Sequence, residues 1–166
     1  MSDRINQSQL SKLLIEVFQS SKKFFENLES FNFKTTYKPD NSPLTILDKK
    51  IDFYIKEELN KFRNDFSVIS EESGQKKLDS EYLWIIDSID GTKELISGSD
   101  EFTVNIALIQ NKRPIFGGIY QPLKDTIFLG GSDLSPMKIK GTKTLALKNQ
   151  ENELCNIVIS KSHSTN

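Results

Sequence analysis

Residues 84–92 read Trp84-Ile85-Ile86-Asp87-Ser88-Ile89-Asp90-Gly91-Thr92, an apolar run that leads directly into two aspartates, a glycine and a hydroxyl residue. The acidic pair Glu71-Glu72 lies sixteen positions before the first aspartate. An unpaired carboxylate beside an apolar core costs free energy, so carboxylates in such a place need partners. Because Mg2+ prefers oxygen ligands and takes several at once, this stretch predicts a strand that ends at a cation site.

The composition is that of a water-soluble globular chain with one ordinary domain. The 166 residues are 36% hydrophobic and 27% charged, which is enough to build a core. The net charge of -1 provides no electrostatic footprint for a nucleic-acid polymer. A single cysteine, Cys155, excludes an intramolecular disulfide and a cysteine zinc site. The sequence has neither a secretory signal nor a transmembrane segment, which favours a cytoplasmic protein and leaves peripheral membrane association open.

Two helices are expected in the N-terminal part of the chain. Leucine, valine and phenylalanine recur at helical spacing over residues 6–29, which predicts one amphipathic helix there. Turn-forming residues follow over 38–43. Thr45 is a suitable N-cap for a second helix, with Asp48 in its first turn.

After the second helix the apolar pattern changes to that of strands. The expected strands cover residues 66–69, 82–86, 103–109, 115–120 and 126–129. Consecutive hairpin-linked strands after two helices predict an α+β fold, with two N-terminal helices packed on a largely antiparallel sheet. Residues 132–150 fit either a linker or a hairpin of edge strands. A further apolar strand is expected from Leu154.

The carboxylates suggest phosphate-ester chemistry. Asp87, Asp90 and the carbonyl of Ile89 can point into one pocket at a strand end, as in metal-dependent phosphoryl transfer. If a helix begins at Gly91 or Thr92, its free N–H groups form a site for phosphate. Taken alone, D-x-x-D-G-T is also a common turn sequence, and the preceding strand and upstream Glu pair favour the functional interpretation.

Several motifs together resemble those of a known family. They are S-E-E at 70–72, W-I-I-D-S-I-D-G-T at 84–92, D-N-S-P-L-T at 40–45 followed by Asp48, D-G-T-K-E at 90–94, E-F-T-V-N-I-A-L-I at 101–109 and I-S-K-S-H at 159–163. The chain resembles the inositol monophosphatase-like phosphatases, and within them the 3'(2'),5'-bisphosphate nucleotidase branch. The resemblance implies a Mg2+-dependent phosphatase that hydrolyses 3'-phosphoadenosine 5'-phosphate, a small nucleotide bisphosphate, to AMP and phosphate by metal-activated water.

The resemblance also implies a role for each matching residue. It assigns one Mg2+ to Glu71, Asp87 and the Ile89 carbonyl, and a second to Asp87 and Asp90, while Glu71 either shares a third ion or orients the attacking water. It pairs Asp48 with Thr92 to activate that water. The substrate-binding groups it implies are Glu71, Ile89, Asp90, Gly91 and Thr92. Apart from the resemblance, side-chain alternation at a strand end predicts that Glu72 points away from Glu71 and lies at the surface or behind the metal ligands.

Three alternatives remain open at this stage. Relatives in this family continue into a second αβα domain, so residues 1–150 are expected to form the metal-binding domain and residues 151–166 to begin the second. The chain is then either an enzyme or a non-catalytic N-terminal fragment of one. A substrate of the inositol 1-phosphate or fructose bisphosphate type is the third alternative. A homodimer is also compatible with the sequence, as is a substrate contact from 160–163.

Overall fold

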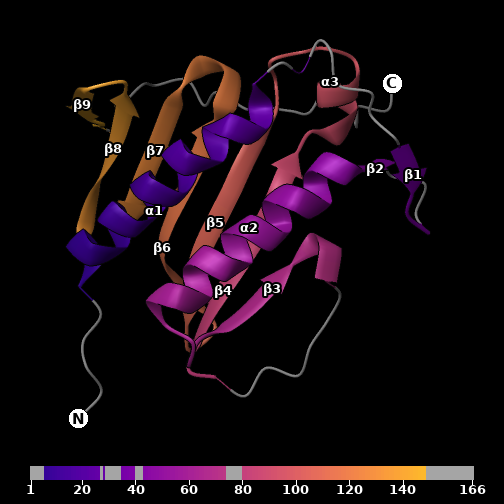
Figure 1. Ribbon diagram of the computed structural model, residues 1–166. Helices are drawn as coiled ribbons and strands as arrows, with labels where there is room; N and C mark the ends of the chain where they lie inside the picture. The colour runs from indigo at the N-terminus through magenta and orange to yellow at the C-terminus, as the bar shows by residue number, and fades with distance from the viewer. Residues whose placement is uncertain (1–5, 27, 29–34, 40–42, 74–79, 149–166) are drawn as a thin grey trace, which may run out of the picture.

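A seven-stranded sheet with two helices on one face forms the body of the protein (Figure 1). The computed structural model describes residues 6–26, 28, 35–39, 43–73 and 80–148. The helices are α1 (Gln7–Ser21), α2 (Ile46–Phe62) and α3 (Thr92–Ile96), with 3-10 turns η1 (Lys22–Phe25), η3 (Glu71–Ser73) and η4 (Pro122–Lys124). The strands are β1 (Thr35–Tyr37), β2 (Pro43–Thr45), β3 (Ser67–Ser70), β4 (Tyr82–Asp90), β5 (Thr103–Gln110), β6 (Arg113–Gln121), β7 (Thr126–Gly131), β8 (Leu134–Lys140) and β9 (Lys143–Ala146). The predicted α+β class is confirmed.

The sheet follows chain order from β3 to β9, while β1 and β2 form a separate antiparallel pair. Strands β3 and β4 are parallel, and every later neighbour is antiparallel. Residues 132–150, which fitted either a linker or a hairpin, contain the edge hairpin of β8 and β9. Strand β4 runs beyond the predicted residue 86 to Asp90, because Asp87 pairs with Asn105 and Asp90 with Thr103 across an irregularity between them.

The first helix is shorter than the apolar pattern predicted. Asn6 caps its start by accepting a hydrogen bond from the Ser8 amide, and the α-helix ends at Ser21 instead of near residue 29. The chain then tightens into η1, and Phe25 packs against Phe102 with ring centroids 5.7 Å apart. The prediction was wrong at this end because a buried phenylalanine after the helix continues the same spacing.

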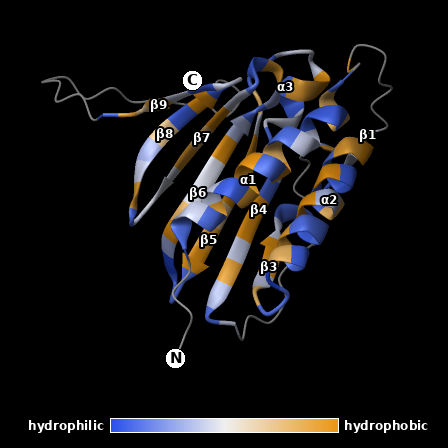
Figure 2. Cartoon of the chain, turned by 60° about the vertical axis from the view of Figure 1, so that its left-hand side comes forward, coloured by the Kyte–Doolittle hydropathy of each residue, from blue (hydrophilic) through white to orange (hydrophobic). Residues whose placement is uncertain are grey.

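The core lies between the helices and the sheet face they cover (Figure 2). Trp84 and Ile86 of β4 face this layer, and Ile85 between them is 42% exposed, as strand alternation requires. A Cβ added at Gly118 would lie 2.7 Å from both Leu129 Cδ2 and Phe18 Cε2. The glycine therefore allows α1 to approach β6 closely. Among helices in the described ranges, none is both long and apolar enough to cross a membrane.

Candidate active site

The candidate site lies where β3 and β4 end. The two strands are parallel, and Ser70 pairs with Ile86, so Glu71 and Asp87 follow at neighbouring positions on the same edge of the sheet. Helix α2 begins nearby and contacts β4 and η3, and α3 begins directly after β4. The strand register therefore brings together the two acidic motifs that the sequence separates by sixteen residues.

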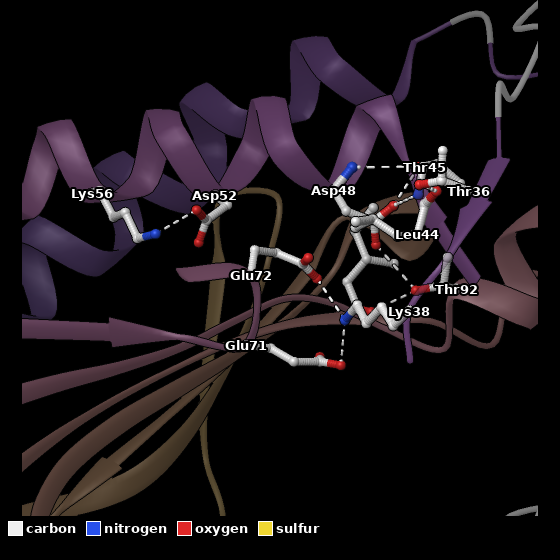
Figure 3. Close-up of polar contacts among 11 residues, drawn as sticks. Thr36, Lys38, Leu44, Thr45, Asp48, Asp52, Lys56, Glu71, Glu72 and Thr92 are labelled. Carbon is white, nitrogen blue, oxygen red and sulfur yellow. Dashed lines mark hydrogen bonds and ion pairs between the residues drawn. The ribbon is translucent and has the colours of Figure 1, made fainter. Parts of the chain in front are cut away.

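Asp48 is the buried polar centre of this region, with 1% of its surface exposed (Figure 3). Its Oδ2 accepts hydrogen bonds from the Thr45 amide, at 2.8 Å, and from the Thr45 hydroxyl. The Asp48 amide donates in turn to the Thr45 hydroxyl oxygen, which completes a capping box at the start of α2. Its Oδ1 accepts a hydrogen bond from the Thr92 hydroxyl at 3.0 Å. The predicted Asp48–Thr92 pair is thus present, and the same carboxylate also starts a helix.

Lys38 connects the strand pair β1–β2 to the acidic turn η3 (Figure 3). Its ammonium donates hydrogen bonds to Glu71 Oε1 at 2.6 Å and to Glu72 Oε1 at 2.9 Å. Burial lowers the pKa of Lys38, but the hydrogen bonds and charges of both glutamates outweigh it, and the net pKa is raised. The expectation that Glu72 points away from Glu71 was wrong, because the two lie in a 3-10 turn and not on a strand.

Asp87 carries the clearest electrostatic signal in the site. Its Oδ1 is buried and has no hydrogen-bond partner among the described residues. Burial, followed by the negative charges of Glu71 and Asp90, raises the pKa of Asp87 to about 7. A half-buried carboxylate with one unpartnered oxygen and other carboxylates nearby is destabilised as an anion, and a cation would reduce that cost.

The residues around Gly91 shape the turn between β4 and α3. Gly91 has a φ of +98°, and a Cβ there would lie 3.0 Å from the Glu101 carbonyl oxygen and 3.1 Å from Phe102 Cβ. The Ile89 carbonyl accepts a hydrogen bond from the Thr92 hydroxyl at 3.2 Å. The predicted helix does begin at Thr92, although α3 has only five residues.

The ligand atoms of the site are of the type that a hard divalent cation binds, but their side chains do not converge on one point. Glu71, Asp87, Asp90 and a backbone carbonyl supply oxygen ligands only, as Mg2+ prefers. Within the part of the chain that the structure describes, no three acidic, histidine or cysteine side chains converge closely enough to hold a metal. Glu71 is turned to Lys38, and Asp90 Oδ2 accepts a hydrogen bond from Asn105 at 3.3 Å. The site thus gathers oxygen donors, one of which, Glu71, is paired with an ammonium.

Sequence reasoning missed three residues of the site: Lys38, Glu72 as a buried group, and Asn105. Lys38 lay in a stretch rich in turn formers, and the partner of Asn105 follows only from the β4–β5 register. Asp40, Ser42 and the segment 160–163, which the resemblance singled out, lie outside the described residues.

The raised pKa of Asp87 predicts that the thermal stability of the protein depends on pH when a chelator removes metal ions. The folded protein binds a proton at Asp87 that the unfolded chain, with a value near 3.8, releases. Stability should therefore fall as pH rises from about 4 to about 7. Asp87→Asn, which resembles the protonated form, should flatten this fall and raise Tm at pH 7.5 by a few degrees. Thermal melts in EDTA from pH 5 to 8 measure this effect.

The exposed carboxylate of Asp133 provides the control, because Asp133→Asn should follow the wild-type curve. Parallel curves for Asp87→Asn and wild type would contradict the prediction.

Comparisons with known proteins give a consistent family. The model of the inositol monophosphatase family matches residues 6–166. A Buchnera aphidicola protein named 3'(2'),5'-bisphosphate nucleotidase CysQ is 35% identical over 133 residues, covering 77% of this chain and 49% of that protein. An Aquifex aeolicus protein named fructose-1,6-bisphosphatase/inositol-1-monophosphatase is 34% identical over 140 residues, covering 81% and 50%. The chain thus spans about half the length of these curated relatives.

A solved structure shares the fold as well as the sequence pattern. CysQ from Bacteroides thetaiotaomicron, described as a bacterial member of the inositol monophosphatase family, is 33% identical to this chain with a TM-score of 0.65. The match covers 86% of this chain and 52% of that one.

Proposed function

This chain belongs to the inositol monophosphatase family, and from that premise we propose that it is a Mg2+-dependent phosphatase that hydrolyses 3'-phosphoadenosine 5'-phosphate to AMP and phosphate. The observation that carries the proposal is the part-buried Asp48–Thr92 hydrogen bond, at 3.0 Å, beside the neighbouring positions of Glu71, directly after β3, and Asp87 in β4. A proton-accepting carboxylate beside a set of cation ligands is what the hydrolysis of a phosphate ester by water needs.

The proposed metal ligands are Glu71, Asp87, Asp90 and the Ile89 carbonyl, for two or three Mg2+ ions. The unpartnered Oδ1 of Asp87 and its raised pKa support a cation there. When bound, Mg2+ supplies charge neutralisation for the phosphoryl oxygens and makes water a stronger nucleophile. The irregularity of β4 between Asp87 and Asp90 interrupts regular strand alternation and so sets the relative direction of the two carboxylates.

The proton-transfer role falls to Asp48 acting with Thr92. The Thr92 hydroxyl lies 3.0 Å from Asp48 Oδ1 and 3.2 Å from the Ile89 carbonyl, so its one proton can be directed to either oxygen. When the hydroxyl proton points to Asp48, the Thr92 oxygen can accept a proton from water while its own proton passes to the carboxylate, so Asp48 gains one proton in all. The backbone N–H groups of Gly91 and Thr92, at the start of α3, are the proposed contacts for the phosphate.

The identity of the substrate is the most specific part of the proposal. Two relatives match this chain almost equally well, one named a bisphosphate nucleotidase and the other a fructose-1,6-bisphosphatase/inositol-1-monophosphatase. The Buchnera relative, which is named a bisphosphate nucleotidase and is 35% identical, supports the nucleotide, and the Aquifex relative makes a sugar or inositol phosphate the second candidate. We also propose that residues 1–150 form the metal-binding domain and that residues 151–166 begin a second, αβα domain.

A substrate panel tests the proposal. Phosphate release is measured with this chain from 3'-phosphoadenosine 5'-phosphate, inositol 1-phosphate and fructose 1,6-bisphosphate, each with Mg2+ and with EDTA. We expect Mg2+-dependent turnover, with the nucleotide preferred by at least about tenfold, a difference of about 1.4 kcal/mol in activation free energy. Preference for inositol 1-phosphate or fructose 1,6-bisphosphate would favour the second candidate. No turnover of any substrate by the folded chain would contradict catalysis by these 166 residues.

A further inference from the structure

The ion pair of Lys38 with two glutamates occupies one of the proposed cation ligands. The ammonium lies 2.6 Å from Glu71 Oε1 and 2.9 Å from Glu72 Oε1. The Lys38 side chain is 18% exposed, that of Glu72 is 8% exposed, and that of Glu71 is 50% exposed. One buried cation is therefore shared between a buried carboxylate and a half-exposed one.

We propose that Lys38 is a built-in competitor for the metal: its ammonium holds Glu71 in the metal-free protein, and Mg2+ binding moves it off Glu71 while Glu72 retains it. The proposal rests on the proposed metal site and adds a residue that sets its affinity. Both cations bind carboxylate oxygens, and two positive charges at one oxygen repel each other. Binding of one therefore opposes binding of the other at Glu71.

The two glutamates differ in how easily they lose the ammonium. Glu72 is almost completely buried, and a buried carboxylate left without a partner is strongly destabilising. Glu71 is half-exposed, so water can solvate its carboxylate during an exchange of partners. Lys38 should thus leave Glu71 and remain on Glu72.

The arrangement of the acidic side chains agrees with this exchange. Among the described residues no three potential ligands converge, and Glu71 is turned to Lys38. The nearby Asp87 has a buried oxygen without a hydrogen-bond partner and interacts electrostatically with Glu71. Release of Glu71 from Lys38 is the change that lets Glu71 and Asp87 share a cation.

A charge-neutral double variant tests the competition. Lys38→Met with Glu72→Gln removes the ammonium and its buried partner together, leaving the net charge and Glu71 unchanged. We expect the double variant to bind Mg2+ more tightly than wild type, on the order of tenfold, in isothermal titration calorimetry. If Lys38 instead supports the metal site, the double variant will bind Mg2+ equally or less tightly, which would overturn the inference.

A second ion pair in the same protein provides the matched control. Lys56 and Asp52 on α2 form a pair of similar burial, with side chains 22% and 9% exposed, and neither residue is among the proposed ligands. Lys56→Met with Asp52→Asn should leave the Mg2+ affinity within about twofold of wild type. A gain equal to that of the Lys38 and Glu72 variant would show a general effect of removing ion pairs and would overturn the competition.

Chemical labelling follows the ammonium directly and separates the two proposals. Acetylation of Lys38, measured by mass spectrometry in the wild-type chain, should become several-fold faster when Mg2+ is added, while acetylation of Lys56 should not change. Mg2+ binding in calorimetry without faster Lys38 labelling would overturn the inference alone. No measurable Mg2+ binding to the wild-type chain would overturn the proposed metal site, and the competition with it.

Discussion

Asp90→Asn is expected to release phosphate at least about 100-fold more slowly than the wild-type chain, without loss of the fold. The substitution removes one negative charge from the proposed ligand set and replaces an anionic oxygen by an amide. Asp90 is exposed at the end of β4, and its Oδ2 accepts a 3.3 Å hydrogen bond from Asn105. An asparagine oxygen can accept the same bond, so Tm should change little.

A nearby exposed aspartate serves as the control for the loss of rate in Asp90→Asn. Asp100 is also exposed, lies ten residues further along the chain and pairs with Lys124 at 3.2 Å. Asp100→Asn should keep phosphate release within about twofold of wild type. An Asp90→Asn protein that unfolds, or that hydrolyses substrate as fast as Asp100→Asn, would argue against Asp90 as a metal ligand.

The fold could be predicted where local pattern and tertiary structure agree. Helix α2 begins after Thr45 as expected, because the cap and the acidic residue in its first turn are both local signals. Strand β4 continues past residue 86 although its sequence turns polar, because pairing with β5 satisfies the backbone through Asp90. Backbone pairing of this kind is not visible in the hydrophobic pattern of one strand.

The sequence indicated which residue types form the site, but not all of the contacts between them. The acidic motifs indicated a cation site, and the resemblance supplied the Asp48–Thr92 pair. The contacts of Lys38 with Glu71 and Glu72 depend on where β1–β2 lies relative to η3, which no local spacing encodes. The parallel register of β3 and β4 joins acidic motifs that are distant in the sequence. The 3-10 turn η3 then lets both glutamates reach one lysine.

Asp48→Asn should separate catalysis from helix capping. The asparagine oxygen can take the place of Oδ2 and accept the Thr45 amide hydrogen bond, now 2.8 Å long. Its NH2 group can donate to the Thr92 hydroxyl, which then donates to the Ile89 carbonyl 3.2 Å away. The hydrogen-bond network is preserved and the proton acceptor is lost. We therefore expect a fall in kcat of about 100-fold or more, with a small change in Tm.

Thr45→Ala should show the opposite balance. It removes a hydroxyl that accepts hydrogen bonds from the Leu47 and Asp48 amides and donates to the Asp48 carboxylate. The loss of the cap should lower the free energy of unfolding by about 1–2 kcal/mol, while the Asp48 carboxylate and its bond to Thr92 remain. Rates of phosphate release and thermal melts of both variants decide the matter. If Asp48→Asn lowers Tm as much as Thr45→Ala and keeps its rate, Asp48 is a capping residue alone. If Asp48→Asn is slow but stable while Thr45→Ala is active but less stable, proton transfer belongs to the Asp48 carboxylate. Both residues cap the helix, and only Asp48 then affects the rate.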